Sequence, residues 1–61
     1  MYHVSLKVKG HWQPVARWFD LLDGATTWGQ DVLAEGAEVG ITGFRVQDEA
    51  DRTVCSVENE T

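Results

Sequence analysis

Cysteine, proline, methionine and basic residues are all scarce in this chain of 61 residues. Its single cysteine, Cys55, has no partner for an internal disulfide, which excludes the disulfide-stapled secreted miniproteins. No apolar run approaches the ~18 residues of a membrane span, and the N-terminus lacks the apolar stretch of an export signal. These absences favour a cytoplasmic protein that does not bind membranes.

Residues that could carry catalysis are also few. His3, His11 and Cys55 are the candidates for a nucleophile and its base, and they are scattered along the sequence. A zinc site needs about four ligands at recognisable spacing, and the glycines between positions 36 and 43 follow no phosphate-loop pattern. We therefore expect a protein that is not an enzyme, with no catalytic residue, cofactor or metal. The remaining enzymatic alternative is a site completed by oligomerisation.

The composition is that of a small globular domain. Hydrophobic residues make up 43% of the chain and charged residues 25%. Ten acidic residues stand against five basic ones, which gives a formal net charge of −5. The length allows one domain, residues 1–61, which buries about 60% of the surface that its unfolded chain exposes. We expect the tail, residues 58–61, to fray.

The N-terminal segment has the pattern of a β-strand. Apolar and polar side chains alternate over residues 2–9, so that one face is buried and the other is in water. Gly10 ends the alternation. The sequence predicts a strand over 2–9.

Two helices are predicted in the middle of the chain. Over residues 14–23, apolar side chains recur at helical spacing from Val15, Pro14 suits the first helical position and Gly24 suits the end. This helix would bury Trp18. A capping-box pattern at residue 27 and a modest apolar stripe predict a second helix over 28–35.

The C-terminal third has the pattern of a β-hairpin. Apolar residues lie on both sides of Gly43, where a bulge would bring them to one face. An acidic turn over 48–51 then leads into a strand over 52–57, with Cys55 packed inside the hairpin.

The register of this hairpin stays open at the level of sequence. A four-residue loop pairs Phe44 with Cys55, whereas a three-residue loop pairs Val46 with Val54. The predicted fold is thus α+β, in the order β-α-α-β-β, with a three-stranded sheet and one or two helices on one face.

The charges suggest two different binding surfaces. Basic residues fall on the predicted strands, on the sheet face without helices, and acidic residues fall on the helices, the turn and the tail. Trp12 lies in a polar stretch and is either a lid on the core or an interface residue. The first candidate surface comprises Trp12, Asp20, Asp23, Asp31, Glu35 and Glu38. The alternative surface comprises His3, Lys7, Lys9, Arg45 and Arg52.

The first surface leads to the main functional hypothesis. We expect a protein-interaction module, an inhibitor or adaptor of a host or defence protein, whose acidic side meets a basic target. A phage-type blocker and a nucleic-acid mimic are special cases.

The alternative hypothesis is nucleic-acid binding through the basic sheet face. Sheet-based binders stack bases on aromatic side chains, and the predicted fold places no aromatic residue securely on this face. The free strand edges also allow a weak homodimer, through an edge or through the face carrying Val54 and Trp12.

Overall fold

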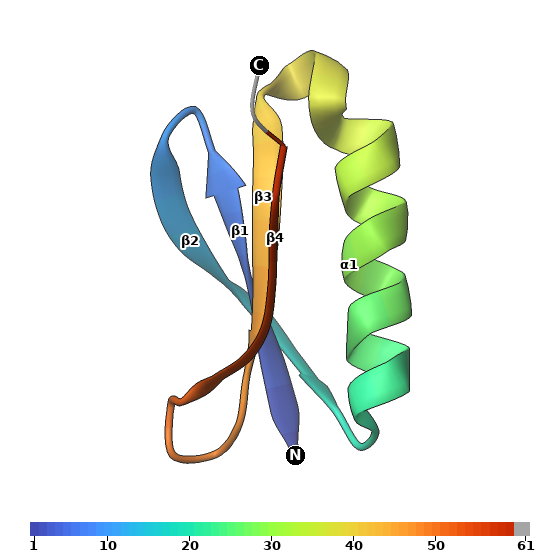
Figure 1. The fold of residues 1–61 in the computed structure, drawn as a ribbon, viewed down its shortest axis with the longest axis vertical. Coiled ribbons are helices and arrows are strands. Elements are labelled where there is room, and N and C mark those ends of the chain that lie inside the picture. Colours follow the sequence, from blue (N-terminus) through green and yellow to red (C-terminus); the bar gives the residue numbers. More distant parts are fainter. Residues whose placement is uncertain (60–61) are drawn as a thin grey trace.

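A computed structural model describes residues 1–59 of the chain. It contains one helix packed on an antiparallel sheet of four strands, in the spatial order β2-β1-β3-β4 (Figure 1). The elements are β1 (Tyr2–Val8), β2 (His11–Phe19), α1 (Leu22–Gly36), the 3-10 helix η1 (Ala37–Val39), β3 (Ile41–Gln47) and β4 (Thr53–Glu58). Helix α1 covers one face of the sheet and leaves the other without a covering element (Figure 1). No helix within residues 1–59 combines the length and the apolar character needed to cross a membrane.

The α+β class and the helix on one face are confirmed, but the predicted three-stranded sheet is wrong. The segment 14–23, predicted as a helix, lies mostly in strand β2. β2 forms a hairpin with β1 through a two-residue turn at Lys9 and Gly10, whose φ angles of 51° and 85° are both positive. A turn of this kind matches the twist of the flanking strands, and pairing with β1 outweighs the helical spacing of the side chains.

Pro14 fits this strand for a different reason from the one the sequence suggested. It lies in β2 at the edge of the sheet, opposite Ser5. The pairing between β1 and β2 is irregular next to it, between His3 and Ser5. Edge strands and irregularities are where a sheet tolerates proline, because its missing N–H is not needed there.

The remaining elements agree more closely with the sequence. Strand β1 confirms the strand predicted over 2–9, and α1 contains the helix predicted over 28–35. The irregularity expected near Gly43 is also present. In the pairing of β3 with β1, Lys7 faces Gly43 but Val8 faces Ile41, so one residue of β3 is skipped between them.

The hairpin of β3 and β4 adopts neither register throughout. Gln47 faces Thr53, as the shorter predicted loop requires, but an irregularity then shifts the pairing by one residue. Val46 therefore faces Cys55, and the half-buried Cys55 lies on the helix side, as expected. Of the tail expected to fray, Glu58 ends β4 and the N–H of Asn59 donates to the Thr42 carbonyl at 2.7 Å. Residues 60–61 lie outside the described residues.

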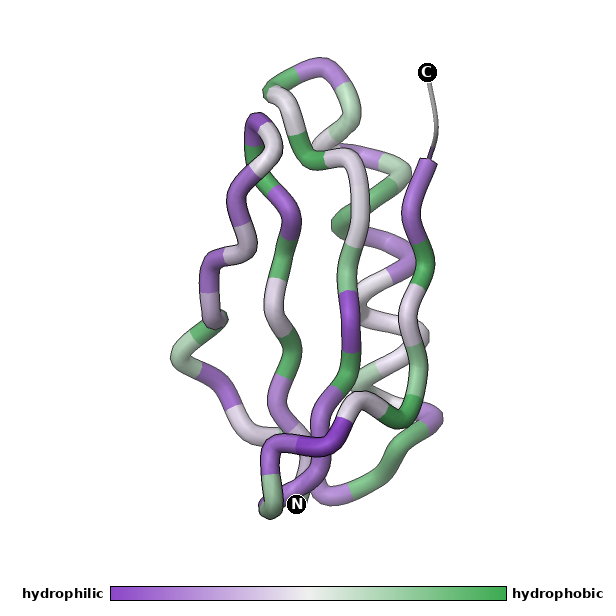
Figure 2. The backbone as a smooth tube through the Cα atoms, turned by 60° about the vertical axis from the view of Figure 1, so that its left-hand side comes forward, coloured by the Kyte–Doolittle hydropathy of each residue, from purple (hydrophilic) through white to green (hydrophobic). Residues whose placement is uncertain are grey.

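The core lies between α1 and the two central strands. Val4, Phe44 and Val46 are fully buried, and α1 adds Ala25 and Leu33. In Figure 2 the two central strands alternate between apolar and polar residues, as strands with one covered face do.

Glycine allows the close approach between helix and sheet. A Cβ at Gly29 would lie 2.8 Å from Cγ of Phe44, so this turn of α1 rests directly on the ring. Gly24, one turn earlier, has more room, because its Cβ would lie 4.0 Å from the Phe19 side chain.

We predict opposite effects for alanine at these two glycines. Gly29→Ala should lower the free energy of unfolding by about 1–3 kcal/mol through overpacking against Phe44, less the ~1 kcal/mol that alanine gains in a helix. Gly24→Ala, the matched control, should be neutral or stabilising. Urea denaturation followed by circular dichroism measures both. Equal effects of the two substitutions would contradict the close contact at Gly29.

Candidate interaction surface on the open face of the sheet

The sheet face turned away from α1, here called the open face, gathers side chains from all four strands. Directly opposed residues on neighbouring strands share a face, and the register places Trp12 beside Lys7, Trp18 beside His3 and Arg45 beside Ser5. The open face comprises Trp12, Pro14 and Trp18 from β2, His3, Ser5 and Lys7 from β1, Arg45 and Gln47 from β3, and Thr53, Ser56 and Glu58 from β4.

Trp12 stacks with two cations near the middle of this face. The guanidinium carbon of Arg45 lies 4.5 Å from the centre of the Trp12 ring, and Nζ of Lys7 lies 5.9 Å from it. Both distances are in the range of cation–π attraction. The Nε atom of Arg45 is buried without a hydrogen-bond partner in the described part of the chain, so stacking on Trp12 is the contact that positions this guanidinium.

Trp18 forms a second aromatic feature at the other end of β2. Its ring centre is 5.1 Å from that of His3, with the two rings tilted by 51°. Trp18 is 56% exposed, which is unusual for so large an apolar side chain. His3 is held on its other side by Asp51, whose Oδ1 is 3.2 Å from the His3 Nε2.

The structure corrects the expected positions of two tryptophans. Trp18 was predicted to be core, but the segment that carries it is a strand and not a helix, so its side chain faces solvent. Trp12, left open between core and interface, is half-buried on the open face. The expectation that no aromatic residue lies on this face is therefore wrong.

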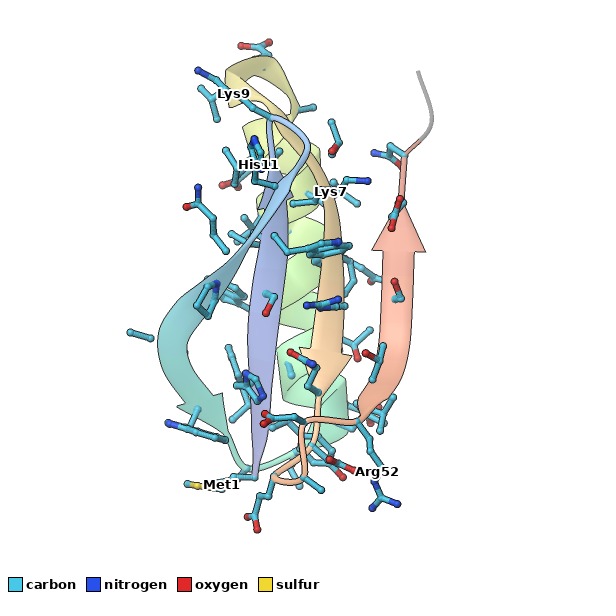
Figure 3. All side chains as sticks on the ribbon, turned by 90° about the vertical axis from the view of Figure 1, so that its left-hand side faces the viewer. Met1, Lys7, Lys9, His11 and Arg52 are labelled. Carbon is cyan, nitrogen blue, oxygen red and sulfur yellow. The ribbon has the colours of Figure 1, made fainter. Side chains whose placement is uncertain are left out.

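The five residues of the basic surface are partly brought together. His3, Lys7 and Arg45 share the open face. Lys9 lies in the turn between β1 and β2 at one end of the sheet, and Arg52 lies in the loop at the opposite end (Figure 3). The sequence analysis placed Lys9 and Arg52 on the sheet face by extending the strand alternation to them, but both residues lie beyond the ends of the strands.

Carboxylates offset much of the positive charge on the open face. Glu58 accepts a hydrogen bond from the Lys7 ammonium at 3.3 Å, and Asp51 contacts His3. The open face is thus an aromatic and cationic centre with an acidic margin rather than a strongly basic patch.

The acidic surface does not join Trp12. Five of its members lie on the helix side or at the ends of α1, and all five side chains are exposed. They are Asp20, Asp23, Asp31, Glu35 and Glu38. Helix α1 covers the sheet face opposite to the open face (Figure 1), so the carboxylates that α1 carries lie across the sheet from Trp12.

Two of the acidic residues line a shallow depression between β2 and α1. Asp23 and Asp31 flank an aromatic floor made by Phe19 and Trp28, whose ring centres are 5.6 Å apart. The guanidinium carbon of Arg17 lies 4.7 Å from the Phe19 ring centre. The chain's own cation therefore occupies the position that a cationic ligand would take on these rings.

The residues that could carry chemistry remain apart. His11 begins β2, His3 faces Trp18 on the open face, and Cys55 lies on the helix side of β4. Within residues 1–59, no three His, Cys, Asp or Glu side chains converge as metal ligands would.

The loop between β3 and β4 is organised around Asp48. Its Oδ1 accepts hydrogen bonds from the backbone N–H groups of Ala50 and Arg52, at 2.9 and 3.0 Å, and its Oδ2 accepts one from Nε of Arg52. The backbone N–H of Arg52 chiefly, helped by that of Ala50 and by the guanidinium charge, holds the pKa of Asp48 below its ordinary value. This loop borders the open face through Asp51.

Comparison of the chain with protein-family models, with curated proteins and with solved structures found no match.

Sequence reasoning missed Trp18 and Pro14 as open-face residues. The signal that could have found them is the Lys9-Gly10 pair, which separates two stretches of similar length. Read as a two-residue turn, this pair aligns Trp12 with Lys7 and gives the second strand of a hairpin.

We predict that acid removes the stabilising effect of Asp48. Since its folded-state pKa lies below the ordinary value of 3.8, the ionised carboxylate stabilises the fold above that pH, and this contribution is lost as the pH falls through the lowered pKa. Asp48→Asn should therefore be less stable than the parent protein at neutral pH and nearly equal to it in strong acid. Thermal unfolding across pH measures the difference. Glu35→Gln, an exposed helix variant, is the control, and a gap between parent and Asp48→Asn that stays constant down to strong acid would contradict the prediction.

Proposed function

We propose that this protein is a non-enzymatic interaction module that recognises another protein through the open face of its sheet. The observation that carries the proposal is Trp12, fixed between Arg45 and Lys7 near the middle of an uncovered face. Tryptophan and arginine are the residue types most enriched at the energetic centres of protein interfaces.

The contacts of Trp12 support a role in binding as well as in stability. Its ring is already held by two cations before any partner arrives, so little side-chain freedom remains to be lost on association. Trp18, more than half exposed at the other end of β2 on the same face, adds apolar area that a partner could cover. The two indoles thus offer a preformed pair of anchors.

The acidic groups suggest the chemistry of the partner. Asp51 and Glu58 lie at the margin of the open face, and the net charge of the chain is −5. A target with an apolar centre and a basic rim would complement this surface and would be steered toward it. This is the pattern expected of an inhibitor or adaptor of a basic protein, and nucleic-acid mimicry is its special case.

We predict that the tryptophans, and not the helix carboxylates, dominate the affinity for a protein partner. Once a partner is recovered by pull-down, Trp12→Ala and Trp18→Ala should each weaken its Kd by tenfold or more. The control, Asp31→Asn with Glu35→Gln, should change the association rate and its salt dependence with little effect on dissociation. Surface plasmon resonance separates these rates. Unchanged binding by both tryptophan variants, with loss of binding in the control, would place the interface on the helix instead.

A second candidate function is binding of single-stranded nucleic acid on the same face. The observation that favours it is an indole, Trp12, beside Lys7 and Arg45, with the exposed Trp18 farther along the same strand, because bases stack on exposed aromatic rings of a sheet and phosphates pair with cations. The net charge and the Lys7–Glu58 pair oppose it. We therefore rank it below protein recognition.

We predict that any such binding depends on Trp12 and on low salt. Fluorescence polarisation with labelled single-stranded RNA and DNA should show binding that Trp12→Ala reduces by tenfold or more and that Glu58→Gln strengthens, since it releases Lys7. Trp28→Phe, on the helix side, is the matched control. Absence of binding at tens of micromolar protein in low salt would eliminate this candidate.

A further inference from the structure

The shallow depression between β2 and α1 has the composition of a site for an organic cation. Phe19 and Trp28 form its floor, with ring centres 5.6 Å apart and ring planes tilted by 46°. Asp23 and Asp31 line it as well, and both side chains are exposed. Aromatic faces attract cations through their quadrupole, and carboxylates attract them through their charge. The depression has a volume of about 460 Å³ and opens widely to solvent, so it suits a side chain presented by a second protein.

The local sequence builds this arrangement from strand and helix spacing. Only two residues separate β2 from α1, so the Phe19 ring at the end of the strand lies next to the first turns of the helix. Asp23, Thr27 and Asp31 follow one another at intervals of four residues and therefore share one stripe of α1, beside Trp28. At a rise of 1.5 Å per residue, the two aspartates are ~12 Å apart along the helix. A cation seated on Trp28 would thus lie between the two carboxylates.

A guanidinium of the chain itself already lies on this floor. The guanidinium carbon of Arg17 is 4.7 Å from the Phe19 ring centre and 5.8 Å from the Trp28 ring centre. The rings therefore accept a planar cation. Within residues 1–59, however, no ion pair joins Arg17 to either aspartate of the depression, and neither aspartate pairs with another cation. The aromatic half of the site is occupied while its acidic half is not.

We propose that this depression binds an arginine side chain of another protein, and that Arg17 is an internal competitor which the incoming arginine displaces. The incoming guanidinium would stack on the two rings as Arg17 does, and it would also donate to Asp23 or Asp31, which Arg17 does not. The depression lies on the helix side of the sheet, so this proposal stands or falls independently of the function proposed for the open face.

The guanidinium group suits both halves of the site. Its flat faces stack on aromatic rings, and the N–H groups at its edge donate to carboxylates, often as a bidentate pair. The lysine ammonium is a strongly hydrated point charge without a flat face. The fact that the chain places a guanidinium on these rings supports arginine as the occupant.

Competition by Arg17 has a consequence that a purely structural contact lacks. The apparent affinity of a ligand falls with the fraction of molecules in which its site is accessible. Removal of Arg17 should therefore strengthen binding of an external arginine. If Arg17 only supported the fold of the depression, its removal would weaken binding or leave it unchanged.

Titration followed by nuclear magnetic resonance tests the site directly. The probe is the blocked tripeptide acetyl-Gly-Arg-Gly-amide at millimolar concentrations, and the same tripeptide with lysine or glutamine at its centre provides the comparison. The indole N–H of Trp28 and the backbone N–H of Gly24 should shift saturably with the arginine peptide, less with the lysine peptide and not with the glutamine peptide. Loss of one indole signal in Trp28→Phe assigns the Trp28 resonance.

The Arg17 variant tests the competition. Arg17→Gln should lower the Kd of the arginine peptide by about threefold, which corresponds to one cation–π contact at an exposed site. Lys9→Gln is the matched control, because it changes the net charge equally but lies at the far end of the sheet from this depression (Figure 3). In the parent chain, the side-chain proton signals of Arg17 should also lose their ring-current shift as the peptide binds.

The carboxylate variants test the acidic half. Asp23→Asn combined with Asp31→Asn should raise the Kd by about fivefold through the loss of exposed ion pairs. Glu35→Gln combined with Glu38→Gln removes the same charge outside the depression and should have a smaller effect. Circular dichroism confirms that each variant is folded.

The outcomes separate clearly. Saturable shifts at the depression, preference for arginine and tighter binding by Arg17→Gln support the proposal. The absence of saturation at tens of millimolar peptide overturns it. An equal response to the arginine and lysine peptides overturns it too, as does an unchanged or weaker affinity in Arg17→Gln.

Discussion

A single helix can cover only one face of a four-stranded sheet, and this constraint shapes the whole molecule. Helix α1 reaches the sheet closely because Gly29 rests on the Phe44 ring, and the core consists of what these two layers enclose. Residues 1–59 contain no second α-helix that could cover the other face. That face must therefore be stable in water while it carries the aromatic residues of β2.

Stacking between cations and aromatic rings meets this requirement. Arg45 and Lys7 lie against Trp12, and His3 lies against Trp18, so each indole loses part of its water-exposed area to a polar neighbour. Long cationic side chains cover apolar surface while their charged ends remain hydrated. The result is an uncovered face on which large flat aromatic groups lie against cationic neighbours, so the residues that stabilise this face are the same ones that the proposed function uses.

The sequence predicted an element correctly where its apolar residues fit only one spacing, that of a strand or that of a helix. It was misleading where the apolar residues fit both spacings. Strand β1 and the middle of α1 follow one pattern each, and both were predicted. Over residues 14–23 the apolar side chains suit a helix, yet the same residues serve a strand whose partner is β1. The deciding information is the backbone geometry at Lys9 and Gly10, which is fixed only when the two strands pair. The positions of Lys7 and Arg45 on the open face could be predicted from the alternation of polar and apolar residues. The positions of the tryptophans could not, because they depend on β2 being recognised as a strand.

The irregular β2 edge has a consequence for the size of any assembly built by strand addition. A sheet with two regular edges can add copies at both ends and grow into a fibre without limit. Here the β2 edge carries Pro14, which has no N–H to donate to a further strand, and its pairing with β1 is irregular. The pairing of the β4 edge with β3 is interrupted as well, next to Val54. Neither edge therefore offers a long regular strand to a further copy, and protection against fibre growth does not depend on net charge alone.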